Sequence, residues 1–177
     1  MVEITLFLLD REAAESLAAN PVAFADEHGW LLAPHEATVV EIAALTARLL
    51  AENGQQAPWV GYLALDVPQR RVVGTCGFNG GPDATGTVEL AYFTFPEEEG
   101  QGIATAMAMA LVRLASEAPS GIVAVRAHTL PERNASCRVL EKVGFQYVGT
   151  ATAPNEGIVW RWELPSTRSA LVLRERG

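Results

Sequence analysis

The chain has 177 residues, of which 49% are hydrophobic and 19% are charged. This composition excludes a disordered protein and fits one domain with a full hydrophobic core. The formal net charge of −8 disfavours nucleic acid as a partner and suits a cationic ligand such as an amine better.

The N-terminal third predicts a strand followed by helices. Residues 1–10 contain an apolar stretch without a basic flank or a cleavage site, and the stretch is too short to span a bilayer. We expect a strand over 3–9 and no membrane segment in the chain. Helical periodicity predicts one helix over 11–19, ended by Pro21, and another over 38–53, with Thr38 and Glu41 at capping-box spacing. Residues 23–36 fit either a short helix or a loop over a pocket.

The remainder predicts mostly strands with two further helices. Alternation and turn residues predict strands over 59–66, 71–78, 87–95, 122–127, 145–150 and 157–164, and helices over 102–117 and 135–143. Residues 165–177 form a tail that either packs or stays free. Without a repeat or linker, these elements predict a single α/β domain spanning residues 1–177.

The two cysteines, Cys76 and Cys137, lie in separate segments and have no CxxC spacing. We expect both to be buried, inert thiols, which indicates a reducing, cytoplasmic location. Cys137 has no base at a readable spacing, so a nucleophilic role is disfavoured. The three histidines, His28, His35 and His128, show no metal-ligand spacing, and we expect no metal.

Residues 87–118 predict a strand, a turn containing Gly100 and Gly102, and a long helix. Such a turn presents unpaired backbone N–H groups at the positive end of a helix dipole, which favours a phosphate or pyrophosphate. Glycines suit it because a Cβ would collide with the ligand or forbid the required dihedral angles. A plain glycine-containing turn remains the alternative at this point.

A second segment, residues 128–145, reads HTLPERNASCRVLEKVGF. Together with EEEGQGIATAM, it resembles the GNAT superfamily of N-acetyltransferases, and within it the branch of ribosomal-protein-alanine N-acetyltransferases. The matching residues are Asn134, Ser136, Val139, Leu140, Glu141, Lys142, Gly144 and Phe145. The resemblance is strongest over 72–148. It implies a GNAT fold, with a central mixed, splayed sheet of about seven strands and about four helices.

The resemblance also implies an acetyl-CoA site without a metal. Backbone groups of Phe93, Thr94 and Phe95 would hold the pantetheine arm, and Asn134 would contact it. Amides of the turn and of the helix start would cradle the pyrophosphate, namely those of Gly100, Gln101, Gly102, Ile103, Ala104 and Thr105. Homodimers are common in this family, but nothing in the sequence establishes one here.

The chain departs from the family pattern at two positions. Relatives usually have Gln or Arg where this chain has Glu97, and commonly Arg where it has Glu99. Three consecutive carboxylates oppose a bound pyrophosphate unless their side chains point to solvent. This departure leaves open an alternative, a non-catalytic GNAT-fold acyl-CoA sensor or binding module. An unrelated α/β domain with a phosphate-binding turn is a third reading.

Many relatives carry a tyrosine on the second motif's helix that reprotonates the leaving thiolate, and here Leu140 or Glu141 stands in its place. Ser136 is then the nearest candidate to meet the thioester sulfur, unless it is an ordinary first-turn serine. Asn134 is also a favoured helix N-cap, and the two roles can coexist.

Acetyl transfer to an amine requires a group that accepts a proton from the ammonium ion. Glu89 shares a strand face with Ala91, Phe93 and Phe95, and the resemblance puts it near the acceptor, so we select it as the base. A solvated carboxylate or a cross-strand ion pair is the alternative. His128 is the best placed histidine. Trp30, Trp59 and Tyr92 either line the acceptor site or belong to the core.

The resulting hypothesis is an enzyme, an acetyl-CoA-dependent N-acetyltransferase acting by direct attack of a primary amine, with Glu89 and Ser136 as its catalytic residues. The acceptor is a protein N-terminus, a polyamine-like molecule, an amino acid or an antibiotic, and the sequence does not choose among them.

Overall fold

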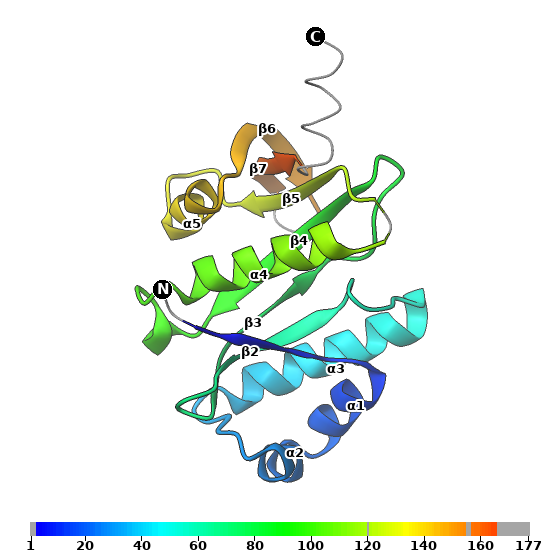
Figure 1. Ribbon diagram of the computed structural model, residues 1–177, viewed down its shortest axis with the longest axis vertical. Helices are drawn as coiled ribbons and strands as arrows, with labels where there is room; N and C mark the ends of the chain where they lie inside the picture. Colours follow the sequence, from blue (N-terminus) through cyan, green and yellow to red (C-terminus); the bar gives the residue numbers. More distant parts are fainter. Residues whose placement is uncertain (1–2, 120, 155–156, 166–177) are drawn as a thin grey trace.

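The computed structural model describes residues 3–119, 121–154 and 157–165, so the tail beyond Pro165 lies outside the described residues. Seven strands and five α-helices occur within those ranges, with a short 3₁₀ turn, η1, between β4 and α4 (Figure 1). In chain order they are β1 (Thr5–Leu8), α1 (Arg11–Ala19), α2 (Pro21–His28), α3 (Glu36–Asn53), β2 (Gly61–Asp66), β3 (Arg71–Phe78), β4 (Thr87–Thr94), η1 (Pro96–Glu98), α4 (Ile103–Glu117), β5 (Ala124–Thr129), α5 (Ala135–Val143), β6 (Gln146–Ala153) and β7 (Gly157–Pro165).

The strands form one mixed sheet in the order β1-β2-β3-β4-β5-β7-β6. Every neighbouring pair is antiparallel except β4 and β5, which run parallel. These two central strands pair only where Thr87, Val88 and Glu89 face Ala124, Val125 and Arg126. Beyond that point β4 continues against β3 and β5 continues against β7, so the sheet splays open at its centre. The predicted mixed, splayed sheet of seven strands is confirmed.

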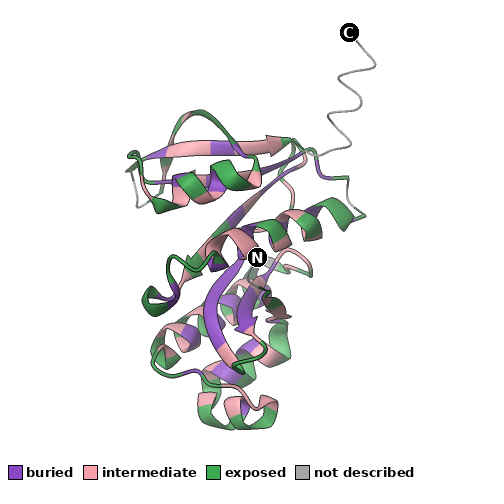
Figure 2. Ribbon diagram, turned by 60° about the vertical axis from the view of Figure 1, so that its left-hand side comes forward, coloured by how far each residue is buried: buried purple, intermediate pink, exposed green. Residues whose placement is uncertain are grey.

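The two faces of the sheet bury different cores. Cross-strand partners Tyr62, Cys76 and Tyr92 lie on the face whose core includes Met107 and Leu111 of α4. Leu63 lies on the opposite face, in a core shared with α1, α2 and α3. Figure 2 shows the buried residues concentrated along the central strands and the inward sides of the helices. A helix layer therefore covers each side of the splayed centre.

Most predicted elements occur within three residues of their expected bounds, and three of the differences have a clear physical cause. The undecided stretch, residues 23–36, begins inside α2, in which Pro21 is at the first helical position and the Asn20 side chain accepts a hydrogen bond from the amide of Ala23. This adds a fifth helix to the expected four. Helix α3 begins at Glu36 with no side-chain cap, so the capping box predicted at Thr38 and Glu41 is wrong. Strand β5 ends two residues later than predicted, because it continues to pair with β7 as far as Thr129.

Candidate functional site

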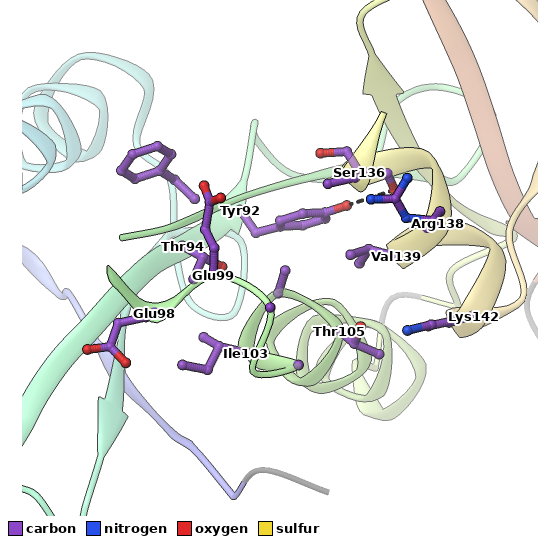
Figure 3. Close-up of a pocket in the computed structure, with 15 residues that line it drawn as sticks. Tyr92, Thr94, Glu98, Glu99, Ile103, Thr105, Ser136, Arg138, Val139 and Lys142 are labelled. Atoms are coloured by element: carbon purple, nitrogen blue, oxygen red, sulfur yellow. Dashed lines mark hydrogen bonds between the residues drawn. The ribbon is translucent and has the colours of Figure 1, made fainter. Parts of the chain in front are cut away.

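A cavity of about 620 Å³ opens at the splay, between the end of β4, the turn after it, and the starts of α4 and α5 (Figure 3). Its lining comprises Tyr92, Phe93, Thr94, Glu98, Glu99, Gly100, Gly102, Ile103, Ala104, Thr105, Ala135, Ser136, Arg138, Val139 and Lys142. Eight of the residues selected from sequence line it, namely Phe93, Thr94, Gly100, Gly102, Ile103, Ala104, Thr105 and Ser136. The fold thus joins the two sequence motifs in one cavity.

The turn between β4 and α4 exposes free backbone donors to this cavity. Gly100 and Gly102 have φ angles of 77° and 88°, in the left-handed region that side chains with a Cβ rarely adopt. Gly102 caps α4 without a side-chain hydrogen bond, and the first helical turn contains no acidic residue. The first amides of a helix have no partner within it, so those of Ile103, Ala104 and Thr105 offer an anion site at the positive end of the dipole.

The carboxylates of Glu97 and Glu98 have side-chain partners outside the cavity. Glu97 Oε2 lies 2.5 Å from Nε2 of His35. Its own backbone N–H, followed by His35, holds the pKa of Glu97 below its ordinary value. Glu98, with 6% of its side chain exposed, pairs with Arg71 at 2.5 Å, and its carboxylate points away from the cavity (Figure 3).

Glu99 is the member of the run whose charge remains uncompensated, because it is exposed and has no ion pair or side-chain hydrogen bond among the described residues. Glu98 is removed from the expected conflict with a pyrophosphate by its pair with Arg71, and the exposed carboxylates that remain are screened by solvent.

Helix α5 adds two cations to which the sequence reasoning gave no role in the site. Arg138 and Lys142 line the cavity with Ala135 and Val139, at spacings of three, four and seven residues along one helix face. Figure 3 shows both extending from α5 toward the cavity. Neither forms an ion pair with a carboxylate of the described chain, so both charges are free to meet phosphate. The helical spacing was the signal that could have found them.

Asn134, Gln101 and Phe95, also expected to bind the cofactor, do not line the cavity. Asn134 Oδ1 accepts a hydrogen bond of 3.0 Å from the amide of Cys137, so it caps α5. The Gln101 side chain donates to the Glu98 carboxylate at 3.1 Å. Phe95 is fully buried and stacks on His35, with 4.1 Å between ring centroids. These three side chains therefore contact neighbouring parts of the protein and not the cavity.

Tyr92 lies at the inner end of the cavity, although the sequence left it as either acceptor-site lining or core. Its hydroxyl is 3.5 Å from the carbonyl oxygen of Ser136, bridging β4 and α5 across the splay (Figure 3). Burial raises the pKa of Tyr92 to about 12, so it stays a neutral O–H donor at physiological pH. Leu140 is fully buried and Glu141 pairs with Arg133, so neither can replace the tyrosine of relatives.

Glu89 lies outside the first cavity, beside a second one of about 210 Å³. Its Oε1 accepts a hydrogen bond of 2.7 Å from the Asn79 side-chain amide and lies 3.2 Å from Nδ1 of His128. The second cavity is lined by Asn79 and also by Tyr92 and Phe93, where it meets the first. The carboxylate thus has the cross-strand partner considered from sequence, and through Asn79 it contacts a residue that lines the second cavity.

The other aromatic candidates belong to the core. Trp30 packs against Phe7, with 4.7 Å between ring centroids, and Trp59 against Phe78 at 5.0 Å. Both cysteines are free and buried, as expected, and burial raises the pKa of the Cys76 thiol.

Within the described ranges, no group of three or more His, Cys, Asp or Glu side chains could hold a metal. No helix there is long and apolar enough to cross a membrane.

A protein-family model described as an acetyltransferase (GNAT) domain matches residues 4–146. No curated protein matches the chain. Among solved structures, the ribosomal L7/L12 alpha-N-protein acetyltransferase RimL in complex with coenzyme A has a TM-score of 0.64 and 16% identity, covering 94% of this chain and 97% of that one. The aminoglycoside acetyltransferase AAC(6')-Ib with coenzyme A has a TM-score of 0.63 and 20% identity, covering 97% and 99%.

A spermidine N-acetyltransferase SpeG chimera from Vibrio cholerae and hSSAT has a TM-score of 0.64 and 16% identity, covering 94% and 98%. These structures share the fold of the chain. By their names they act on a protein, an aminoglycoside and a polyamine, so the shared fold does not choose an acceptor.

Proposed function

Because the chain belongs to the GNAT acetyltransferase family, we propose that it transfers the acetyl group of acetyl-CoA to a primary amine by direct attack. The observation that carries the proposal is the convergence of first-turn helix amides, left-handed glycines and the cations Arg138 and Lys142 on one cavity at the splayed strands. Bound acetyl-CoA would supply an activated thioester at this place.

The residues present fit acetyl-CoA in charge and in backbone chemistry. The amides of Ile103, Ala104 and Thr105 would receive the pyrophosphate, with Arg138 and Lys142 as counter-charges. Beyond Glu89, the β4 edge has no ladder partner in β5, so its backbone groups near Phe93 and Thr94 are available to the amide-containing pantetheine arm. These features support the sequence-based assignment of the cofactor site.

We further propose that Glu89 accepts the proton of the incoming ammonium ion, directly or through water. Its hydrogen bond to Asn79, a residue of the second cavity, supports this role. At the other end of the reaction, the hydroxyls of Ser136 and Tyr92 both border the first cavity and are candidates to donate a hydrogen bond to the departing thiolate. The net charge of −8 supports an amine acceptor, and the two free thiols support a cytoplasmic location.

Calorimetric titration with acetyl-CoA tests the cofactor site. Ala104 lines the cavity within the first turn of α4, so Ala104→Trp should fill it and abolish binding. Met109 lies on the same helix, is 44% exposed and does not line the cavity, so Met109→Trp is the matched control and should bind like the natural chain. Equal binding by all three proteins would refute the site. Binding without acetylation of any amine would instead indicate an acyl-CoA sensor.

A further inference from the structure

The second cavity lies between α3 and the sheet, on the face of the sheet that α4 does not cover. Helix α3 contributes Ile42, Leu45 and Leu49, at spacings of three and seven residues, and these side chains form an apolar wall. Because the cavity meets the acetyl-CoA cavity at Tyr92 and Phe93, a molecule held in it reaches the same segment of β4 from the other side. This position is suited to the acceptor.

Small residues on three adjacent strands make the floor of this cavity. Gly61, Gly77 and Ala91 face one another across β2, β3 and β4 and all line it. A Cβ on Gly77 would come within 2.6 Å of the Val60 carbonyl oxygen, so a larger residue there is excluded. At Gly61 the side chain of Thr46 already lies where a Cβ would stand, so the floor at both glycines is closely packed backbone.

The lining contains no charged residue, and this limits what can be held there. The charged residues on the flank of α3, Glu41, Arg48 and Glu52, are exposed and do not line the cavity. Glu89 is the acidic group beside it, at the Asn79 edge, and it is occupied by Asn79 and His128. One carboxylate therefore serves one ammonium group, and a second cation would be placed against leucine and isoleucine without a counter-charge.

We propose that this cavity, lined by apolar α3 side chains over a glycine and alanine floor, selects primary amines that carry a compact apolar body and no second positive charge. The inference rests on the proposed acetyltransferase function and specifies its acceptor class. It runs against the expectation from net charge alone, because a surface charge of −8 would favour polycationic amines. The residues that line the cavity, and not the net charge of the protein, determine which acceptor side groups fit.

Pentylamine and 1,5-diaminopentane form a matched pair of acceptors, because they share the reacting group and chain length and differ by one terminal ammonium. The natural chain should acetylate pentylamine with a kcat/KM about tenfold or more above that for the diamine. Leu45 is 40% exposed, so Leu45→Glu adds a carboxylate to the wall and should shift the ratio toward the diamine, whereas Leu45→Gln should not.

Two further variants separate the cavity from other causes. Val22→Glu adds the same charge on α2, at a residue that is 60% exposed and outside the cavity, and should leave the ratio unchanged. Ala91→Leu fills the floor and should raise KM for pentylamine without changing the dissociation constant of acetyl-CoA, since Ala91 does not line the first cavity. Thermal melting confirms that each variant is folded.

The outcomes distinguish the two proposals. Equal or preferred use of the diamine by the natural chain would overturn the inference and leave the acetyltransferase function intact. A ratio that responds to Val22→Glu as strongly as to Leu45→Glu would also overturn it, because the overall charge would then be the cause. Binding of acetyl-CoA with no transfer to either amine would overturn the inference, and only a failure to acetylate any amine of a wider panel would overturn the proposed function as well.

Discussion

At the scale of single residues, Glu89 combines a catalytic assignment with a structural contact. Its carboxylate accepts a hydrogen bond from Asn79 and lies next to His128, while Ala91 and Phe93, two and four residues later on the same strand face, line the second cavity. A carboxylate that only stabilised the sheet would be expected to leave the pH dependence of transfer unchanged. The role as a base can therefore be tested separately from the role in the fold.

Replacement of Glu89 by Gln preserves the side-chain shape and should lower kcat/KM by about 10²–10⁴ at neutral pH, the range for a positioned general base. The loss should shrink as the pH approaches the pKa of a free amine, about 10, because the acceptor then arrives already deprotonated. Steady-state kinetics from pH 7 to 10 measure this convergence. Glu117→Gln, at the exposed end of α4, is the control and should match the natural chain throughout.

A constant loss across the pH range would contradict the assignment of Glu89 as base and leave it as a positioning residue for His128. Strand alternation placed this residue on the face of Phe93, and the family resemblance, which puts it near the acceptor, was needed to select it as the base. It could not reveal Asn79 or His128 as its neighbours, since these contacts join three strand ends that are separated along the chain.

At the scale of elements, the turn between β4 and α4 assigns three adjacent glutamates to three different environments. Glu97 reaches His35 in the connection before α3, Glu98 is buried against Arg71 of β3, and Glu99 lines the cavity with no side-chain partner in the part of the chain that the structure describes. These two contacts hold the turn against the connection before α3 and against the sheet. This explains how a run of carboxylates can stand beside an anion site.

The three environments predict different effects of substitution. Glu98→Ala leaves the half-buried Arg71 guanidinium without its partner and should reduce the free energy of unfolding by about 2–3 kcal/mol, below the 3–5 kcal/mol typical of a fully buried pair. For a chain of this length that corresponds to a melting temperature lower by about 5–10 °C. Glu99→Gln should change stability by less than about 0.5 kcal/mol and strengthen acetyl-CoA binding a few-fold at low salt.

Thermal unfolding and calorimetric titration at two salt concentrations measure both effects. If Glu99→Gln weakened binding, this side chain would have to contribute a favourable contact to the ligand. If Glu98→Ala were neutral, the Arg71 pair would have no part in fastening the turn.

The element scale also shows why the sequence predicted the fold better than the site. Helix α5 has the bounds expected from its local signals, an Asn134 cap and a left-handed Gly144 after Val143. Helix α2 was left undecided because its eight residues are too few to establish a period, and it is held by the packing of Phe24 against Phe7 and Trp30. The second cavity was invisible because it depends on which residues face one another across strands.

At the scale of the whole molecule, the splayed sheet buries side chains of tyrosine and cysteine in their protonated, uncharged form. Tyr62, Cys76 and Tyr92 are direct cross-strand neighbours on β2, β3 and β4. Burial raises the pKa of Tyr62 and of Tyr92 to about 12, and that of Cys76 as well. The Tyr62 hydroxyl donates a 2.8 Å hydrogen bond to the Pro58 carbonyl, which an ionised phenolate could not do. The row that supports the cavities is thus stable only in its protonated form.

This row predicts a loss of stability in alkali. The pKa values are higher in the folded chain than in the unfolded one, so raising the pH ionises the unfolded chain first and draws the equilibrium toward it. The free energy of unfolding should be level below about pH 8 and fall between about pH 9 and 12, since ordinary Cys and Tyr titrate at about 8.5 and 10. Each tenfold difference in proton affinity corresponds to about 1.4 kcal/mol.

Urea unfolding followed by tryptophan fluorescence from pH 7 to 11 measures this decline in the free energy of unfolding. Tyr92→Phe removes one of the ionisable groups that cause it. The variant should lose less stability per pH unit than the natural chain above pH 9, whatever its stability at pH 7. Tyr147→Phe, at a residue that is 51% exposed, should keep the natural slope. An unchanged slope in Tyr92→Phe would show that the phenol beside the splay is solvated, and Tyr92 would then no longer qualify as a neutral hydrogen-bond donor in the catalytic cavity.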